Sequence, residues 1–195
     1  MLSYEESLKI LKRTDALLEG HFILSSGLHS KKYIQCAQLL SFPNEAKVIC
    51  SSLAEKIREK FKKIDVILSP AIGGIVVGYE IGRQLNVKSI FAERELGNLI
   101  LRRGFVLPEK SNVLIVEDVI TTGKSVLECA KLIATSKANL IGFACIIDRS
   151  NKMISNDHEI ISQVKINIET YNENNLPNDL QNIKPVKPGS RNIKK

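Results

Sequence analysis

Apolar runs of strand length, separated by helical patterns, constrain the fold of this chain more than any other feature. Helical spacing over residues 75–85 and 125–136 follows the first and the third run. Continuous apolar strands that alternate with helices are typical of a parallel sheet buried on both faces. The chain is therefore predicted to be an α/β protein with helices on both sides of a central sheet. The runs are VILS (66–69), SIFAE (89–93), VLIVED (113–118) and LIGFACIID (140–148), and VKINIE (164–169) is a candidate fifth strand.

The first 40 residues do not follow this alternation. A capping box that begins at Ser3 starts a first helix, which is expected to end near Gly20. HFIL (21–24) and KYIQ (32–35) then predict two short strands around a turn at Gly27. We expect this N-terminal segment to form a small subdomain packed on the sheet, within a single domain that takes in all 195 residues.

Composition and charge limit the classes of function. A hydrophobic fraction of 44% is ordinary for a globular protein, and no apolar run is long enough to cross a bilayer. We therefore expect a cytoplasmic protein with no membrane partner. Of the net charge of +7, the acid-free tail 184–195 contributes +5, which leaves about +2 for the rest of the chain. A basic terminus containing Pro and Gly is more often solvated than a binding arm, so no nucleic-acid partner is expected.

The cysteines and histidines give no metal-binding pattern. No two cysteines have C-x-x-C spacing and each lies among apolar neighbours, so we expect buried free thiols. The histidines are too scattered for H-x-x-x-H spacing, so no zinc or iron held by protein ligands is expected. The residues concerned are Cys36, Cys50, Cys129 and Cys145, and His21, His29 and His158.

Polar or glycine-rich residues stand at the end of each of the four apolar runs. Ligands of open α/β sheets bind beyond the carboxyl ends of the strands, so the sequence predicts a ligand site at this edge. The residues expected there are Ser69–Gly74, Glu93 with Arg94, Glu117 with Asp118, and Asp148 with Arg149.

The segment VLIVEDVITTGKS (113–125) indicates what the ligand is. Its last three residues resemble the end of a P-loop, but the first glycine of that motif is replaced by Asp118, which would repel phosphates. The helix start after the threonine-rich turn can bind a phosphate monoester through its N–H groups. The two carboxylates can accept hydrogen bonds from the vicinal hydroxyls of a sugar. A ribose 5-phosphate therefore fits this segment.

The same segment resembles the phosphoribosyl diphosphate (PRPP) motif of type I phosphoribosyltransferases, with an apolar strand, two acids and a Thr-Thr-Gly turn. The resemblance implies the type I phosphoribosyltransferase fold, and it implies that Glu117 and Asp118 hold the ribose hydroxyls. It also implies a loop that wraps the 5′-phosphate and consists of Val119, Ile120, Thr121, Thr122, Gly123, Lys124 and Ser125.

Three further segments are similar to parts of orotate phosphoribosyltransferases. Residues 21–35 resemble the hood over the base, 91–105 the mobile catalytic loop, and 186–191 the C-terminal end of one branch. By this resemblance, the amides that face the diphosphate belong to Ala71, Ile72, Gly73 and Gly74. The implied contacts with orotate come from Thr121, Arg149, Ser25, Ser26 and Gly27.

Arg149 suits this role on its own chemistry as well. Orotate carries a carboxylate, and a guanidinium at a strand end can bind a carboxylate through two parallel hydrogen bonds. An isolated Asp-Arg pair is as often a surface feature, but here the neighbouring site favours a functional role.

The chain departs from the better-known branch of this family in its cations. Ser25 and Gly73 replace two lysines, and the mobile loop carries arginines in place of lysines and a histidine. Arg94 is the strongest catalytic candidate because it directly follows a strand. One of the other two arginines of this loop, Arg102 or Arg103, is open to a structural ion-pair role instead. His29 is expected to make a structural hydrogen bond in the hood. The arginines expected around the leaving diphosphate are Arg94, Arg102 and Arg103.

The resemblance implies that orotate and PRPP react to give orotidine 5′-phosphate and diphosphate, a step of de novo UMP synthesis. Mg²⁺ is the implied cofactor, bound mainly through PRPP because this ion is rarely held by protein ligands alone. A homodimer is also implied, in which the mobile loop of one subunit serves the other's site.

Two alternatives share the PRPP motif. A phosphoribosyltransferase for a purine base should lack the hood segment and Arg149. A PRPP-sensing regulator usually adds a nucleic-acid-binding module, for which only the short basic tail is spare.

Overall fold

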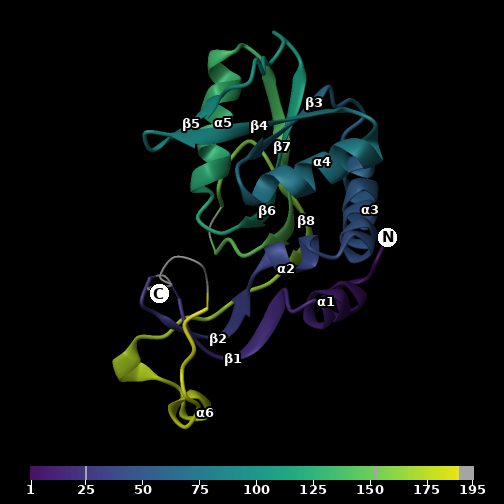
Figure 1. Cartoon of the computed structure of the whole chain (residues 1–195). Coiled ribbons are helices and arrows are strands. Elements are labelled where there is room, and N and C mark those ends of the chain that lie inside the picture. Colours follow the sequence, from purple (N-terminus) through teal and green to yellow (C-terminus); the bar gives the residue numbers. More distant parts are fainter. Residues whose placement is uncertain (25, 152, 189–195) are drawn as a thin grey trace.

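A six-stranded sheet forms the centre of the computed structural model, which describes residues 1–24, 26–151 and 153–188 (Figure 1). The strand order is β5-β4-β3-β6-β7-β8, and every neighbouring pair is parallel except β4 and β5. The predicted α/β fold is confirmed. The strands are β3 (Val66–Pro70), β4 (Lys88–Glu95), β5 (Asn98–Leu101), β6 (Asn112–Ile120), β7 (Asn139–Asp148) and β8 (Ile160–Lys165).

Helices cover both faces of the sheet, and successive residues of a strand alternate between them. Ile67 packs with the first group of helices, whereas Val66 and Leu68 pack with α5 on the opposite face. This alternation follows from the two-residue period of a strand. The helices of the first face are α1 (Tyr4–Arg13), α3 (Pro43–Lys60) and α4 (Gly73–Leu85), and α5 (Lys124–Thr135) covers the second.

The first helix is shorter than predicted. The capping box at Ser3 is present, but α1 ends at Arg13, so the prediction that it ends near Gly20 is wrong. Asp15 has a φ of 55°, a left-handed conformation that no helix continues through. Beyond it the chain enters β1 (Leu17–Ile23), in which Gly20 is a strand residue.

The predicted N-terminal strand pair is present as a separate antiparallel sheet of β1 and β2 (His29–Ile34). The turn between them is closed by a hydrogen bond from Gly27 N to Leu24 O (2.9 Å). Gly27 has a φ of 82°, which suits glycine. Figure 1 shows this hairpin below the large sheet, beside the C-terminal part of the chain.

The C-terminal segment belongs to the same hood. Phe22 pairs with Val186, and His29 pairs with Tyr171 through two backbone hydrogen bonds. The predicted structural hydrogen bond of His29 is present: its Nδ1 lies 2.6 Å from Nε2 of His21. The short elements of the hood and its connections are α2 (Cys36–Leu40), η1 (Glu173–Asn175) and α6 (Asn178–Gln181).

The edge strand β8 spans Ile160–Lys165 and not 164–169, so the predicted position was shifted. Its pairing with β7 begins at Ile160 opposite Phe143, and this long-range register leaves Ile166 and Ile168 buried after the strand has ended. All four cysteines are buried and free, as predicted. Within the described ranges, no helix combines the length and the apolar character that a bilayer crossing requires.

Candidate functional site

Glu117 and Asp118 lie inside β6, which continues to Ile120, so the prediction that the strand ends at the acids is wrong. The added length comes from β7, whose pairing with β6 extends to Asp148 opposite Ile120. On the other side, β3 pairs with β6 only as far as Ile115. The acids therefore stand past the last β3 pairing, where the chain of β3 turns away into α4.

The start of α4 packs directly against Asp118. A Cβ atom on residue 73 would lie 2.7 Å from both carboxylate oxygens of Asp118, closer than real contacts allow. A side chain at position 73 would displace the Asp118 carboxylate from the position that it holds here, so Gly73 suits this packing. The helix begins at Gly73, two residues earlier than predicted, so Gly73 and Gly74 supply free N–H groups of a first helical turn. Ala71 and Ile72, joined by a cis peptide bond, precede it.

Burial governs the ionisation of the two acids. It raises the pKa of Glu117 to about 8, and the charge of Asp118 adds to this shift. Burial likewise raises the pKa of Asp118, while hydrogen bonds from its own amide and that of Val119 act in the opposite direction. Two poorly solvated carboxyl groups at neighbouring positions of β6 favour a partner that brings hydroxyl donors or positive charge.

The loop after β6 has the form expected of a phosphate site. Thr121 and Thr122 are exposed, and α5 begins at Lys124 with Ser125 in its first turn. Gly123 precedes the helix with a φ of 75°, and a Cβ there would lie 2.6 Å from Ile154. Glycine is therefore needed at this position both for its conformation and for the contact. Nothing in the sequence marks Ile154 as the residue that supports the loop.

Arg149 directly follows β7 and stands beside the phosphate loop. Its amide donates to Ile120 O (2.8 Å), which places it next to Thr121. The guanidinium Nε is buried and has no hydrogen-bond partner among the described residues. Burial lowers the pKa of Arg149, and the nearby Tyr33 acts against this shift. The structure thus brings together Thr121 and Arg149, two of the five residues for which orotate contacts were predicted.

The hood contributes a residue that the sequence did not single out. Tyr33 of β2 lies near Arg149, and its hydroxyl donates to Gln35 Oε1 (2.8 Å). The period of two along KYIQ could have marked it, because Ile34 is buried and Tyr33 must face the other way. Of the predicted hood contacts, Ser26 and Gly27 are exposed at the turn, and Ser25 lies outside the described residues.

The three predicted catalytic arginines lie on the antiparallel β4–β5 arm or at its end, and each is paired with an acid. Arg94 Nη2 lies 2.7 Å from Glu128 Oε2 on α5. Arg102 lies 3.3 Å from Glu95, and Arg103 donates two hydrogen bonds to Glu93 (2.8 and 2.9 Å). The structure therefore places Arg94 against the helix that starts at the phosphate loop, while Arg102 and Arg103 pair within the arm.

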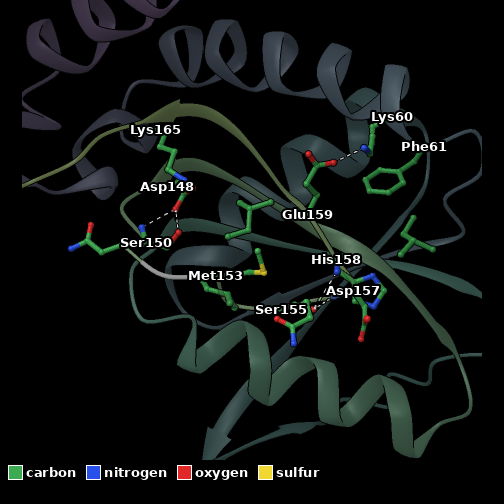
Figure 2. A pocket seen from close by; sticks show the side chains of 15 residues that line it. Lys60, Phe61, Asp148, Ser150, Met153, Ser155, Asp157, His158, Glu159 and Lys165 are labelled. Carbon is green, nitrogen blue, oxygen red and sulfur yellow. Dashed lines mark hydrogen bonds and ion pairs between the residues drawn. The ribbon is translucent and has the colours of Figure 1, made fainter.

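A cavity of about 720 Å³ lies between the sheet and the segment that joins β7 to β8 (Figure 2). In the described parts of the chain, none of the predicted PRPP-binding residues lines it. It borders the site through Asp148 and Ile154. The candidate ligand site is instead the open edge formed by the acids, the loop after β6 and Arg149.

Comparison with known proteins assigns the family. Residues 35–181 match the phosphoribosyl transferase domain family. An orotate phosphoribosyltransferase of Caldicellulosiruptor saccharolyticus is 47% identical over 193 residues, which cover 99% of this chain and 100% of that protein. A second, from Caldicellulosiruptor bescii, is 46% identical over 184 residues, or 94% of this chain and 96% of that one.

This chain belongs to the orotate phosphoribosyltransferases. Among solved structures, the orotate phosphoribosyltransferase of Aeropyrum pernix superimposes with a TM-score of 0.68 at 23% identity, covering 81% of this chain and 92% of that one. An adenine phosphoribosyltransferase of Thermoanaerobacter pseudethanolicus reaches 0.60 at 18% identity, covering 69% and 88%. The fold is therefore shared between enzymes named for different bases, and the sequence identity over the whole chain is what separates the orotate family.

Proposed function

We propose that this chain is a cytoplasmic orotate phosphoribosyltransferase that converts orotate and PRPP to orotidine 5′-phosphate and diphosphate in UMP synthesis. The observation that carries the proposal is the juxtaposition at one sheet edge of Asp118, packed on the start of α4, and Arg149, whose guanidinium Nε is buried without a partner. The first suits a ribose diphosphate, and the second suits a base that bears a carboxylate.

The binding roles follow the chemistry of each element. Glu117 and Asp118 accept hydrogen bonds from the ribose hydroxyls, which relieves their poor solvation. The loop before α5 holds the 5′-phosphate through Thr121, Thr122 and the first helical N–H groups. The N–H groups at the start of α4 face the diphosphate. Arg149 binds the carboxylate of orotate from the next strand end.

In the reaction, a ring nitrogen of orotate forms a bond to the anomeric carbon of the ribose while the bond to the diphosphate oxygen breaks. The ring nitrogen loses its N–H proton in the same transfer, to water or to the departing diphosphate, so the chain need not supply a strong general base. The enzyme's contribution is to hold the two reactants in line and to stabilise the leaving charge. The arm arginines fulfil the second task when they exchange their acid partners for diphosphate.

Mg²⁺ fits the oxygen-rich character of the site, because carboxylate and phosphate oxygens are its preferred ligands. Glu117 and Asp118 would be the residues of this chain that face the ion when PRPP brings it into the site. When bound, the ion neutralises part of the charge on the leaving diphosphate.

We also propose a homodimer formed through one face of α4. Ile72, Val76 and Tyr79 are 85%, 50% and 67% exposed. They follow one another at helical spacing, so they form one apolar stripe directly beside the diphosphate-binding turn. A second copy of the chain on this stripe would bring its own arm close to the neighbouring site, as the family resemblance implies. Sedimentation velocity should show a dimer that Tyr79→Glu dissociates.

A mixing experiment tests whether the arm of one subunit serves the site of the other. Two inactive variants, Asp118→Asn and Arg102→Ala/Arg103→Ala, are mixed, dissociated and allowed to reassemble into dimers. If the arm serves the partner's site, half of the random dimers gain one intact site, and about a quarter of the wild-type activity returns. If the arm serves its own subunit, the mixed dimers also contain one unaltered arm and one unaltered acid pair, but in different sites, so activity stays absent.

The activity itself is tested by following the absorbance of orotate in the presence of PRPP and Mg²⁺. Turnover of orotate supports the proposal, whereas turnover of a purine base without turnover of orotate contradicts it. Arg149→Ala should raise the KM for orotate about tenfold or more and the KM for PRPP much less, because a charge-assisted bidentate pair is lost. An equal change in both constants would show that Arg149 does not bind the carboxylate.

A further inference from the structure

The chain around Arg149 is held by a buried carboxylate with no role in the chemistry proposed above. Asp148, the last residue of β7, is 3% exposed. Its Oδ1 accepts hydrogen bonds from the amide (2.8 Å) and the hydroxyl (2.6 Å) of Ser150, and its Oδ2 lies 3.4 Å from Lys165 Nζ (Figure 2). These two bonds join Asp148 to Ser150, and they therefore span Arg149, the residue between the two in the chain.

Arg149 is thus fixed on both sides by its neighbours and by β6. Its own amide donates to Ile120 O (2.8 Å), and the Asp148–Ser150 bonds lock the turn that follows. Its guanidinium Nε nevertheless remains buried and unpaired within the described residues. Rigid backbone restraint around an unsatisfied cationic side chain is the arrangement expected of a ligand-binding group that is preorganised for its anion.

The bonds to Ser150 also determine where the charge of Asp148 points. In the described part of the chain its ion-pair partner is Lys165, whose side chain is 69% exposed, and not the half-buried Arg149 beside it. A carboxylate released from Ser150 would be free to turn toward the guanidinium and compete with an anionic substrate. Ser150 therefore both orients Arg149 and keeps the nearest carboxylate occupied.

We propose that Asp148 and Ser150 are a positioning pair that aims an unpaired Arg149 at the carboxylate of the base and so contributes to selectivity for orotate. This inference rests on the proposed function of Arg149.

The test is steady-state kinetics of Asp148→Ala in the full chain. The KM for orotate should rise about tenfold or more, since a buried amide and hydroxyl lose their acceptor and the turn loosens. The Kd for PRPP, measured without orotate, should stay within about twofold, because the acids and the phosphate loop are untouched. Asp148→Asn keeps one acceptor oxygen for Ser150 and should recover most of the orotate affinity.

Two controls separate positioning from a general loss of structure. Lys165→Ala removes the exposed partner of Asp148 and should change the KM for orotate less than about twofold. In an Arg149→Ala background, Asp148→Ala should add little to the KM for orotate, because the group that it positions is already gone. Should Asp148→Ala fail to fold, Ser150→Ala removes only the 2.6 Å bond and should raise the same KM about threefold.

Independent, additive effects of Asp148→Ala and Arg149→Ala on the KM for orotate would overturn the inference, as would an equal rise in the Kd for PRPP. If the wild-type protein does not turn over orotate at all, the proposed function fails instead.

Discussion

At the floor of the candidate site, Asp118 lies so close to Gly73 that a Cβ on residue 73 would be 2.7 Å from its carboxylate oxygens. In the β4–β5 arm, by contrast, three arginines reach acids across the surface, and their side chains are 41%, 53% and 62% exposed. The floor consists of β3, β6 and the helices that start beside them, α4 and α5. The two regions are predicted to hold the same ligand, yet they are built by different interactions.

The floor depends on close packing. A Cβ on Gly78 would lie 2.0 Å from Ser69 Oγ, and one on Gly82 would lie 2.9 Å from Ser89 Cβ. This packing fixes α4, whose first amides are proposed to face the diphosphate. The arm depends on exposed ion pairs, each of which contributes about 1 kcal/mol or less. In the proposed function the arm arginines exchange their acid partners for diphosphate. Weakly held ion pairs of this kind would permit that exchange.

The largest effect is expected from Asp118→Asn in the floor. It should lower kcat/KM for PRPP by about 100-fold or more, because the acceptor for a ribose hydroxyl loses its charge. Thermal stability should be unchanged or higher, since a carboxylate whose pKa burial raises is replaced by a neutral group. Asp179→Asn on exposed α6 is the matched control, expected to stay within about twofold. Unchanged kinetics would remove Asp118 from the site.

Gly78→Ala tests whether the floor is as tightly packed as the distances indicate. It should lower the free energy of unfolding by about 1–3 kcal/mol, although alanine favours a helix more than glycine does. Ser69→Ala/Gly78→Ala removes the closest contact and should recover part of the loss in urea denaturation. A Gly78→Ala protein of undiminished stability would show that the floor adapts, and the contrast with the arm would be lost.

The pH dependence of PRPP binding sharpens the comparison. The pKa of Glu117 is raised to about 8, so its carboxyl is largely neutral at pH 7 and must ionise to accept hydroxyls and face Mg²⁺. The Kd for Mg²⁺–PRPP should therefore fall about 20-fold between pH 6.5 and 8.5, in proportion to the ionised fraction of Glu117. Because the folded pKa lies above that of the unfolded chain, the unliganded protein should lose stability as pH rises from about 4.5 through 8.

Glu117→Gln is the control for this titration, since it removes the group that ionises. Isothermal titration calorimetry in buffers of different ionisation enthalpy should detect proton release on binding by the wild type and less by the variant. Equal proton release from both would assign the titration to another group.

The smallest effect is expected in the arm. Glu128→Gln removes the acid that holds Arg94 and should change the free energy of unfolding by less than about 1 kcal/mol. Diphosphate should bind about twofold to threefold more tightly to this variant at low salt, because an internal competitor for Arg94 is gone. A large destabilisation would instead show that Arg94 is a structural residue.

The sequence predicted the parts of the site that depend on local order. The acids, the threonine turn and the helix start are neighbours in the chain, so the spacing of 113–125 was sufficient to indicate a ribose and a phosphate. The positions of the central strands followed from their apolar runs. The ends of elements were less accurate, because Ile120 is kept in β6 by its pairing with β7 and Ile160 is kept in β8 in the same way.

Contacts between distant segments were decided by the tertiary structure alone. The sequence by itself determined the α/β fold, the paired acids and the glycine before α5, since periodicity and motif spacing are properties of neighbouring residues. Only the folded chain brought Gly73 against Asp118, Tyr33 toward Arg149 and Glu128 to Arg94. Such pairs depend on how strands register and helices pack, and no local pattern encodes which side chain then lies opposite which.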